Sequence, residues 1–80
     1  MSRVRLGLKV VEYHGDGEII IRQRVKILDD EGNLIKAPVI EVREKKGRER
    51  VEETRARAER RLERMLKDLE EKVLRRGGVG

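Results

Sequence analysis

The chain has 80 residues, of which 36% are hydrophobic and 46% are charged, and its formal net charge is +5. This length fits one small domain, spanning 1–80, whose single core is only just large enough to keep it folded. No apolar run approaches the ~20 residues of a membrane span, and the first residues do not resemble an apolar export signal. We therefore expect a protein outside the membrane, cytoplasmic if it is natural. The absence of Cys excludes disulfides and thiolate chemistry.

The first strand is expected over residues 3–13, where apolar and basic residues alternate. Because side chains alternate between the two faces of a strand, this pattern predicts one apolar face and one basic face. The pair Val10-Val11 breaks the alternation and indicates a candidate bulge. Residues 14–17 have the composition of a turn, since Gly and Asp tolerate positive φ.

The second strand is expected over 18–28 and the third over 34–45, joined by a turn at 29–33. Gln23 is the one polar residue among the apolar positions of the second strand, and we expect it to bond a neighbour or to lie beyond the helix. Pro38 interrupts the third strand. Because proline cannot donate to the ladder, we expect it on an edge or at a bulge. The short loops predict an antiparallel meander with the second strand in the centre.

The apolar spacing changes to a single helical stripe past Gly47, which predicts an α-helix over 49–76. Gly47 is then the N-cap, and residues 77–80 supply a glycine C-cap and a loose tail. An open alternative has a fourth strand over 48–52, with Thr54 capping a shorter helix. We prefer three strands, because the fourth would place like charges opposite each other.

These elements predict an α+β fold, in which a three-stranded antiparallel meander has one long C-terminal helix packed on one face. The result is a two-layer βββα domain whose interior is filled by branched aliphatic side chains. The expected core residues of the sheet are Val4, Leu6, Leu8, Ile19, Ile21, Val25, Ile27, Ile40 and Val42, and those of the helix are Val51, Ala58, Leu62, Met65, Leu66, Leu69 and Val73.

The groups that catalysis requires are scarce in this chain. His14 is the only histidine and falls in a glycine-rich turn, where we expect an exposed loop residue without the partner and pocket of a general base. Asp16 and Glu18 could join it around a cation, but their spacing matches no calcium loop. Asp29 and its acidic neighbours have ordinary turn composition. We expect no enzymatic activity, no cofactor and no metal.

The second face of the sheet is predicted to be basic, and it is the candidate binding surface. A positive sheet can lie against phosphates, because each contact releases counterions. The alternative is a solvated face whose charges keep the protein soluble and block edge pairing, and we favour this alternative. Ile20 is the apolar exception on this face. The candidate nucleic-acid-binding residues are Arg3, Arg5, Lys9, Arg22, Arg24, Lys26, Arg43 and Lys45.

In the order of its elements and the charge of this face, the chain resembles the arm-binding domains of tyrosine recombinases and the plant ethylene-response DNA-binding domain. The resemblance covers roughly residues 3–76. It implies a three-stranded sheet lying on DNA with a C-terminal helix behind it, and thus a nucleic-acid partner.

The regular periods and simple turns also resemble those of de novo designed βββα proteins. This resemblance implies a stable structural scaffold without an evolved ligand, which is our first hypothesis. A charge-rich surface without Cys is also typical of thermostable proteins. A nucleic-acid-binding module is the second hypothesis. The third is an interaction module that pairs with a second copy through the sheet face or the helix end.

Overall fold

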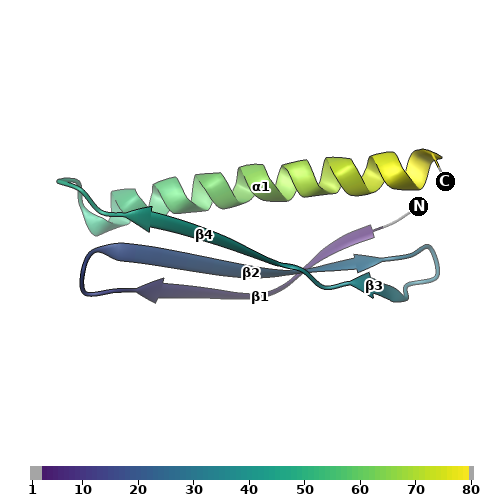
Figure 1. Ribbon diagram of the computed structural model, residues 1–80, viewed down its shortest axis with the longest axis horizontal. Helices are drawn as coiled ribbons and strands as arrows, with labels where there is room; N and C mark the ends of the chain where they lie inside the picture. The colour runs from purple at the N-terminus through teal and green to yellow at the C-terminus, as the bar shows by residue number, and fades with distance from the viewer. Residues whose placement is uncertain (1–2, 80) are drawn as a thin grey trace.

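The computed structural model describes residues 3–79, with side chains through residue 75, and shows an antiparallel sheet beneath one long helix (Figure 1). This architecture confirms the expected α+β fold with a C-terminal helix. The elements are β1 (Arg3–Tyr13), β2 (Glu18–Leu28), β3 (Leu34–Lys36), β4 (Val39–Lys45) and α1 (Val51–Val79). Among the described residues, no helix is both long and apolar enough to cross a bilayer.

The central strand of the sheet is β2, as expected. It pairs with β1 along one edge and with both β3 and β4 along the other. β3 and β4 are therefore two parts of the single third strand that we expected, separated at Ala37-Pro38. Pro38 lies on the outer edge, where its missing N–H costs nothing, and its carbonyl accepts the Val25 N–H at 2.9 Å.

The bulge in β1 is not at Val10-Val11, and that expectation is wrong. Leu6 pairs with Val25 and Lys9 pairs with Gln23, so two residues of β1 lie opposite one residue of β2. The bulge consists of Gly7 and Leu8. Because an extra residue reverses the alternation of side chains, a bulge that comes earlier than expected moves Lys9 to the face opposite to the one expected, whereas Glu12 lies on the expected face.

The helix α1 begins two residues later than expected and ends three residues later. Its first turn is closed by the Arg50 carbonyl, which accepts the N–H groups of Glu53 and Thr54 at 3.0 and 3.2 Å. The alternative strand over 48–52 is wrong, because residues 48–50 belong to no strand and residues 51–52 are helical. Gly77 and Gly78 lie inside the helix with no positive φ, so the expected C-cap and tail are wrong for residues 77–79. Residue 80 lies outside the described part.

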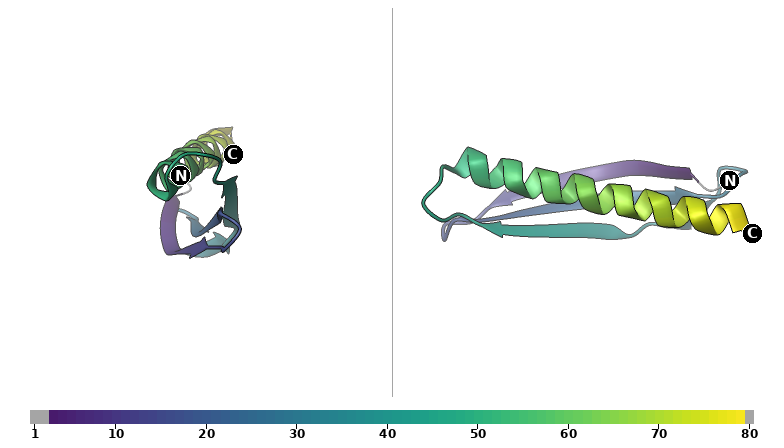
Figure 2. Two further views of the ribbon diagram at one scale, coloured as in Figure 1. Left: turned by 90° about the vertical axis from the view of Figure 1, so that its left-hand side faces the viewer. Right: turned by 90° about the horizontal axis from the view of Figure 1, so that it is seen from above.

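The core is concentrated at one end of the sheet, which we call the turn end because it contains the β1–β2 turn and the start of α1. The opposite end, with the start of β1 and the end of α1, is the terminal end. At the turn end, α1 covers β2 and β4 as a second layer (Figure 2). The buried apolar cluster is Ile19, Ile21, Val42, Ala58 and Leu62.

The expected core is confirmed for the residues of this cluster and only in part elsewhere. Val25 and Val73 are buried, but Leu6 is 59% exposed and Leu8, within the bulge, is 73% exposed. Val51 and Met65 of the helix stripe are also exposed. A slender molecule of 48 × 19 × 13 Å has room for few fully buried side chains, so parts of the stripe stay partly exposed, at its start and at its middle.

Candidate nucleic-acid interface

Seven of the eight predicted binding residues lie on the face of the sheet opposite α1, here called the outer face. Lys9 is the exception, and its assignment to this face is wrong. The bulge turns Lys9 toward the helix, where its Nζ donates to Glu59 Oε2 at 2.6 Å. Lys9 therefore ties the edge strand β1 to α1.

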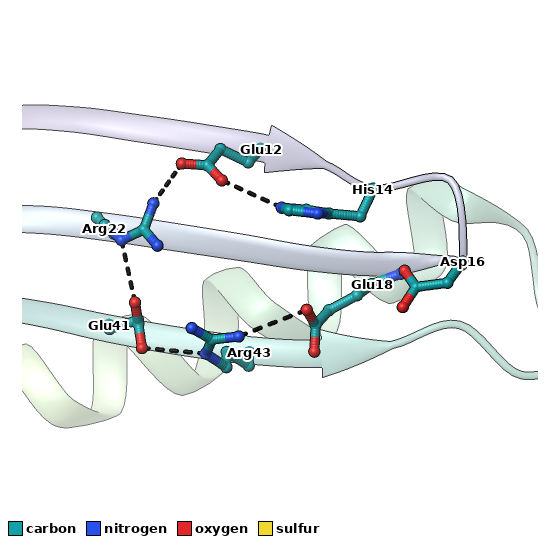
Figure 3. Close-up of polar contacts among 7 residues, drawn as sticks. All are labelled: Glu12, His14, Asp16, Glu18, Arg22, Glu41 and Arg43. Carbon is teal, nitrogen blue, oxygen red and sulfur yellow. Dashed lines mark hydrogen bonds and ion pairs between the residues drawn. The ribbon is translucent and has the colours of Figure 1, made fainter.

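At the turn end, the outer face is covered by alternating acidic and basic side chains (Figure 3). Arg22 donates to Glu12 of β1 and, through Nε, to Glu41 of β4 at 3.0 Å. Arg43 donates from Nε to the other Glu41 oxygen at 3.0 Å and lies 3.5 Å from Glu18. These five residues form a continuous ion-pair chain across three strands. Three carboxylates and two guanidiniums leave it with no excess of positive charge.

Strand register explains why the ion-pair chain forms. Arg22 lies directly opposite Glu41, and Ile20 lies between Glu12 on one side and Arg43 on the other. Ile20 is only 2% exposed although it is on the outer face. Its burial is explained by these charged neighbours, because long charged side chains cover apolar surface with their aliphatic stems while their ends stay in water. Ile20 is thus a buried apolar residue outside the main cluster, and it offers no exposed surface to a partner.

The electrostatics of the ion-pair chain favour its charged form. The pKa of Glu12 is lowered, first by the hydrogen bond with His14, whose Nε2 lies 3.1 Å from its carboxylate, and also by Arg22. The pKa of Glu41 is lowered by hydrogen bonds from Arg43 and Arg22. Both carboxylates therefore keep their negative charge to lower pH than usual. At neutral pH they balance the positive charges of Arg22 and Arg43.

At the terminal end, four basic residues of the outer face have no such partners. Arg3 and Arg5 of β1 and Arg24 and Lys26 of β2 are exposed, and we call them the cationic cluster. Arg5 lies directly opposite Lys26 in the strand register. None of the four side chains forms an ion pair with any residue of the described part.

The bulge helps to build the cationic cluster. Gly7 lies next to Arg24, and a Cβ on Gly7 would approach Arg24 Cβ and Cγ to 3.3 Å. Glycine therefore leaves space for the stem of Arg24 on this face. Behind the bulge, the amide nitrogen of Gln23 donates to the carbonyls of Gly7 at 3.0 Å and Arg24 at 2.9 Å. The expectation that Gln23 bonds a neighbour is confirmed.

The remaining predicted residue, Lys45, is exposed and lies opposite Glu18 in the register, next to the ion-pair chain. It is separated from the cationic cluster by the length of β4. The predicted basic face is thus two surfaces of different character, one neutralised and one positive.

A second set of ion pairs was missed in the sequence. Glu44 has the same parity as Val42, so it lies on the helix side of β4, where Arg57 donates to it at 2.5 Å and Arg61 also donates. Glu49 accepts the Thr54 hydroxyl and lies 2.9 Å from Arg57. The parity of Glu44 was the available signal. These contacts fasten α1 to the sheet.

The remaining acidic residues and the histidine serve local structure. Asp16 accepts the Glu18 N–H at 3.0 Å, and Asp29 accepts the N–H groups of Glu31 and Asn33 at 2.9 and 2.8 Å, as turn residues do. His14 is exposed, and its ring Nε2 lies 3.1 Å from Glu12 of the ion-pair chain. Within residues 3–79 no group of three or more metal-ligating side chains comes together.

Comparison with protein-family models, curated proteins and solved structures finds no match for this chain. The candidate interface therefore rests on its own geometry and charge.

Proposed function

We propose that the protein is a non-enzymatic nucleic-acid-binding module that uses the cationic cluster and not the whole outer face. The observation that carries this proposal is the contrast between the two ends of that face. Arg22 and Arg43 have carboxylate partners, whereas Arg3, Arg5, Arg24 and Lys26 have none within the described residues.

The arrangement of these four cations works against folding stability. Like charges directly opposite each other on neighbouring strands repel, and Arg5 and Lys26 are such a pair. A polyanion laid on this end would relieve the repulsion and release its own counterions. The ion-pair chain begins beside the cluster with Glu41, opposite Arg22, and continues to Glu12 and Glu18, so carboxylates along the rest of this face confine a phosphate backbone to the terminal end.

The competing proposal is a stable scaffold that binds nothing. The ion-pair chain favours it, because neutralised arginines over a buried Ile20 are a structural use of the same face. On this proposal the cationic cluster serves solubility alone. The two proposals differ in one measurable respect, which is binding at low salt.

The test is fluorescence anisotropy with a short labelled DNA duplex between about 50 and 200 mM salt. The double variant Arg24→Glu/Lys26→Glu should abolish binding. Arg60→Glu/Arg64→Glu is the matched control, since it makes the same change in net charge at exposed helix positions outside the sheet. Equal losses in both variants would mean that net charge alone acts. No binding by the parent chain at micromolar concentration would favour the scaffold.

A further inference from the structure

We infer that the cationic cluster binds the phosphate backbone of double-stranded nucleic acid without reading its sequence. This inference rests on the proposed function and specifies its substrate class. It follows from where the chain places its neutral polar and aromatic side chains.

Neutral hydrogen-bonding side chains, which discriminate A·T pairs in a groove, are absent from the outer face in the described part. Gln23 is 4% exposed, lies on the helix side and is bonded to backbone carbonyls. Asn33 lies in the β2–β3 turn and not on a strand, and its side-chain amide donates to Glu31 at 3.4 Å. Thr54 is fully buried in α1. The cationic cluster therefore offers ammonium and guanidinium donors only. These bind phosphates and, among base edges, those of guanine, so any base reading would show as a preference for the G·C-rich duplex.

An aromatic platform for stacked bases is also missing from the outer face. Tyr13 is the only aromatic residue of the chain, and the register places it opposite Ile19, on the helix side. Its hydroxyl accepts a hydrogen bond from Arg55 at 2.7 Å, and the Arg55 guanidinium lies 5.9 Å from the ring centroid. Proteins that hold single strands depend on stacking against such rings. Single-stranded nucleic acid thus loses its main source of affinity here.

The spacing of the cationic cluster fits a dense, rigid polyanion. Its residues form two rows on adjacent strands, which lie ~4.8 Å apart, and same-face residues repeat every ~6.8 Å along each strand. A duplex carries one charge per ~1.7 Å of its axis, which is a higher and more fixed density than that of a single strand. The outer-face neighbours Leu34 and Val39 are aliphatic and exposed, and they add no hydrogen bonds.

Because Arg22 and Arg43 of the turn end have carboxylate partners, we expect only the four residues of the cationic cluster to contact phosphates. Four phosphate contacts predict that log K falls against log salt with a slope of about −3.6, whereas all eight basic residues first assigned to this face would give about −7. Arg24→Gln should weaken binding to every duplex by the same factor and reduce the magnitude of the slope by about 1. Arg60→Gln, on the far side of α1, should leave the slope unchanged.

The experiment measures the binding of the full chain to a G·C-rich duplex, an A·T-rich duplex, a single strand of equal length, inorganic polyphosphate and vesicles containing phosphatidylserine. Equal affinity for the two duplexes, weaker binding to the single strand and a slope near −4 support the inference. A preference for one duplex, a single strand bound as tightly as a duplex, or binding to polyphosphate or vesicles in preference to the duplex would overturn it while leaving anion binding intact. Failure to bind any nucleic acid would overturn the proposed function as well.

Discussion

At the scale of single residues, Gln23 shows how one polar side chain can hold an irregular strand in place. Its amide donates to the Gly7 and Arg24 carbonyls, and a longer contact of 3.4 Å reaches Leu8. Buried carbonyls without partners cost free energy. Gln23→Leu keeps the size of the side chain and removes these bonds, so we expect a loss of about 1–3 kcal/mol in the free energy of unfolding, measured by urea denaturation.

The control for this variant is Lys67→Gln, at an exposed helix position, which should stay within about 0.5 kcal/mol of the parent. If Gln23→Leu is as stable as the parent, the amide does not hold the bulge. The apolar parity of Gln23 marked it in the sequence as unusual. Its partners could not be predicted, because they depend on the position of the bulge.

Glu49 gives a residue-scale prediction for pH. Its pKa is lowered to about 2 by its own backbone N–H and by hydrogen bonds from the Thr54 hydroxyl, Arg57 and the Gly47 N–H. A carboxylate with a depressed folded pKa stabilises the protein above its unfolded pKa, and this stability is lost as pH falls toward the folded value. The loss should therefore fall between about pH 4.5 and pH 2.

We expect Glu49→Gln to lower the melting temperature at pH 7 and to remove part of the decrease that the parent shows in this acid window. Circular dichroism melts at intervals from pH 7 to about pH 2 measure both effects. Glu53→Gln, an exposed helix carboxylate, is the control and should retain the parent's profile. An identical acid decrease in Glu49→Gln and the parent would contradict the role given to Glu49.

At the scale of elements, the contact between β4 and α1 depends on Glu44. Its side chain is 13% exposed and lies between Arg57 and Arg61, which lower its pKa in that order. Glu44→Ala leaves two guanidiniums without this partner, so we expect a loss of about 1.5–3 kcal/mol in denaturant unfolding. Glu63→Ala, exposed on the helix, is the matched control. Equal stabilities would show that the arginines find other partners.

The strands and helix could be predicted because period-two and helical patterns are local properties of the sequence. β1 and β2 have the expected bounds, since each ends at a turn with strong composition, and both turns contain a glycine with positive φ, Gly17 and Gly32. The bulge could not be placed from the sequence. Arg5, Gly7 and Lys9 alternate with apolar residues without a break, so nothing in the pattern marks Gly7 and Leu8 as irregular. The sequence shows that the pattern breaks at Val10-Val11 but not where the extra residue is accommodated.

The candidate interface was predicted as a face but not as a cluster. Parity alone placed Arg22 and Arg24 together, and both do lie on the outer face. Their difference arises from register across strands, which brings Glu41 opposite Arg22 and leaves Val39 opposite Arg24. Register depends on turn lengths and on the bulge, so a pattern within one strand cannot reveal which cation is neutralised.

At the scale of the whole molecule, packing and charge are divided between the two ends. The turn end contains the buried cluster around Ile21 and Val42 and a neutralised outer face. The terminal end contains the cationic cluster and aliphatic side chains that are about half exposed, such as Leu34 at 58% and Leu74 at 53%. The proposed binding surface is thus built on the less densely packed end, which we expect to be the less stable one, as for many functional surfaces.

This division predicts uneven hydrogen exchange along the sheet. Ile21 belongs to the buried cluster and lies on β2, between β1 and β4. The backbone amides around it should therefore exchange only by global unfolding. The start of β1 and the short strand β3 should exchange faster by local opening. Native-state exchange followed by NMR measures both populations, and uniform protection along β1 would contradict the division.

Adding duplex DNA links this measurement to the proposed function. A ligand that binds only the folded form protects against opening by RT ln(1 + [L]/Kd). If duplex rests on the cationic cluster, local opening at Arg5 and Lys26 must break that contact, so exchange there should slow as duplex is added. Protection of the turn end should change only through global stability. Because amides that open only by global unfolding are protected by the same factor, backbone amide chemical shifts in the same titration locate the contact. We expect shift changes at Arg5 and Lys26. Shift changes at Glu12 and Glu41 would instead place the duplex on the ion-pair chain, and they would mean that these carboxylates do not confine the phosphate backbone to the terminal end.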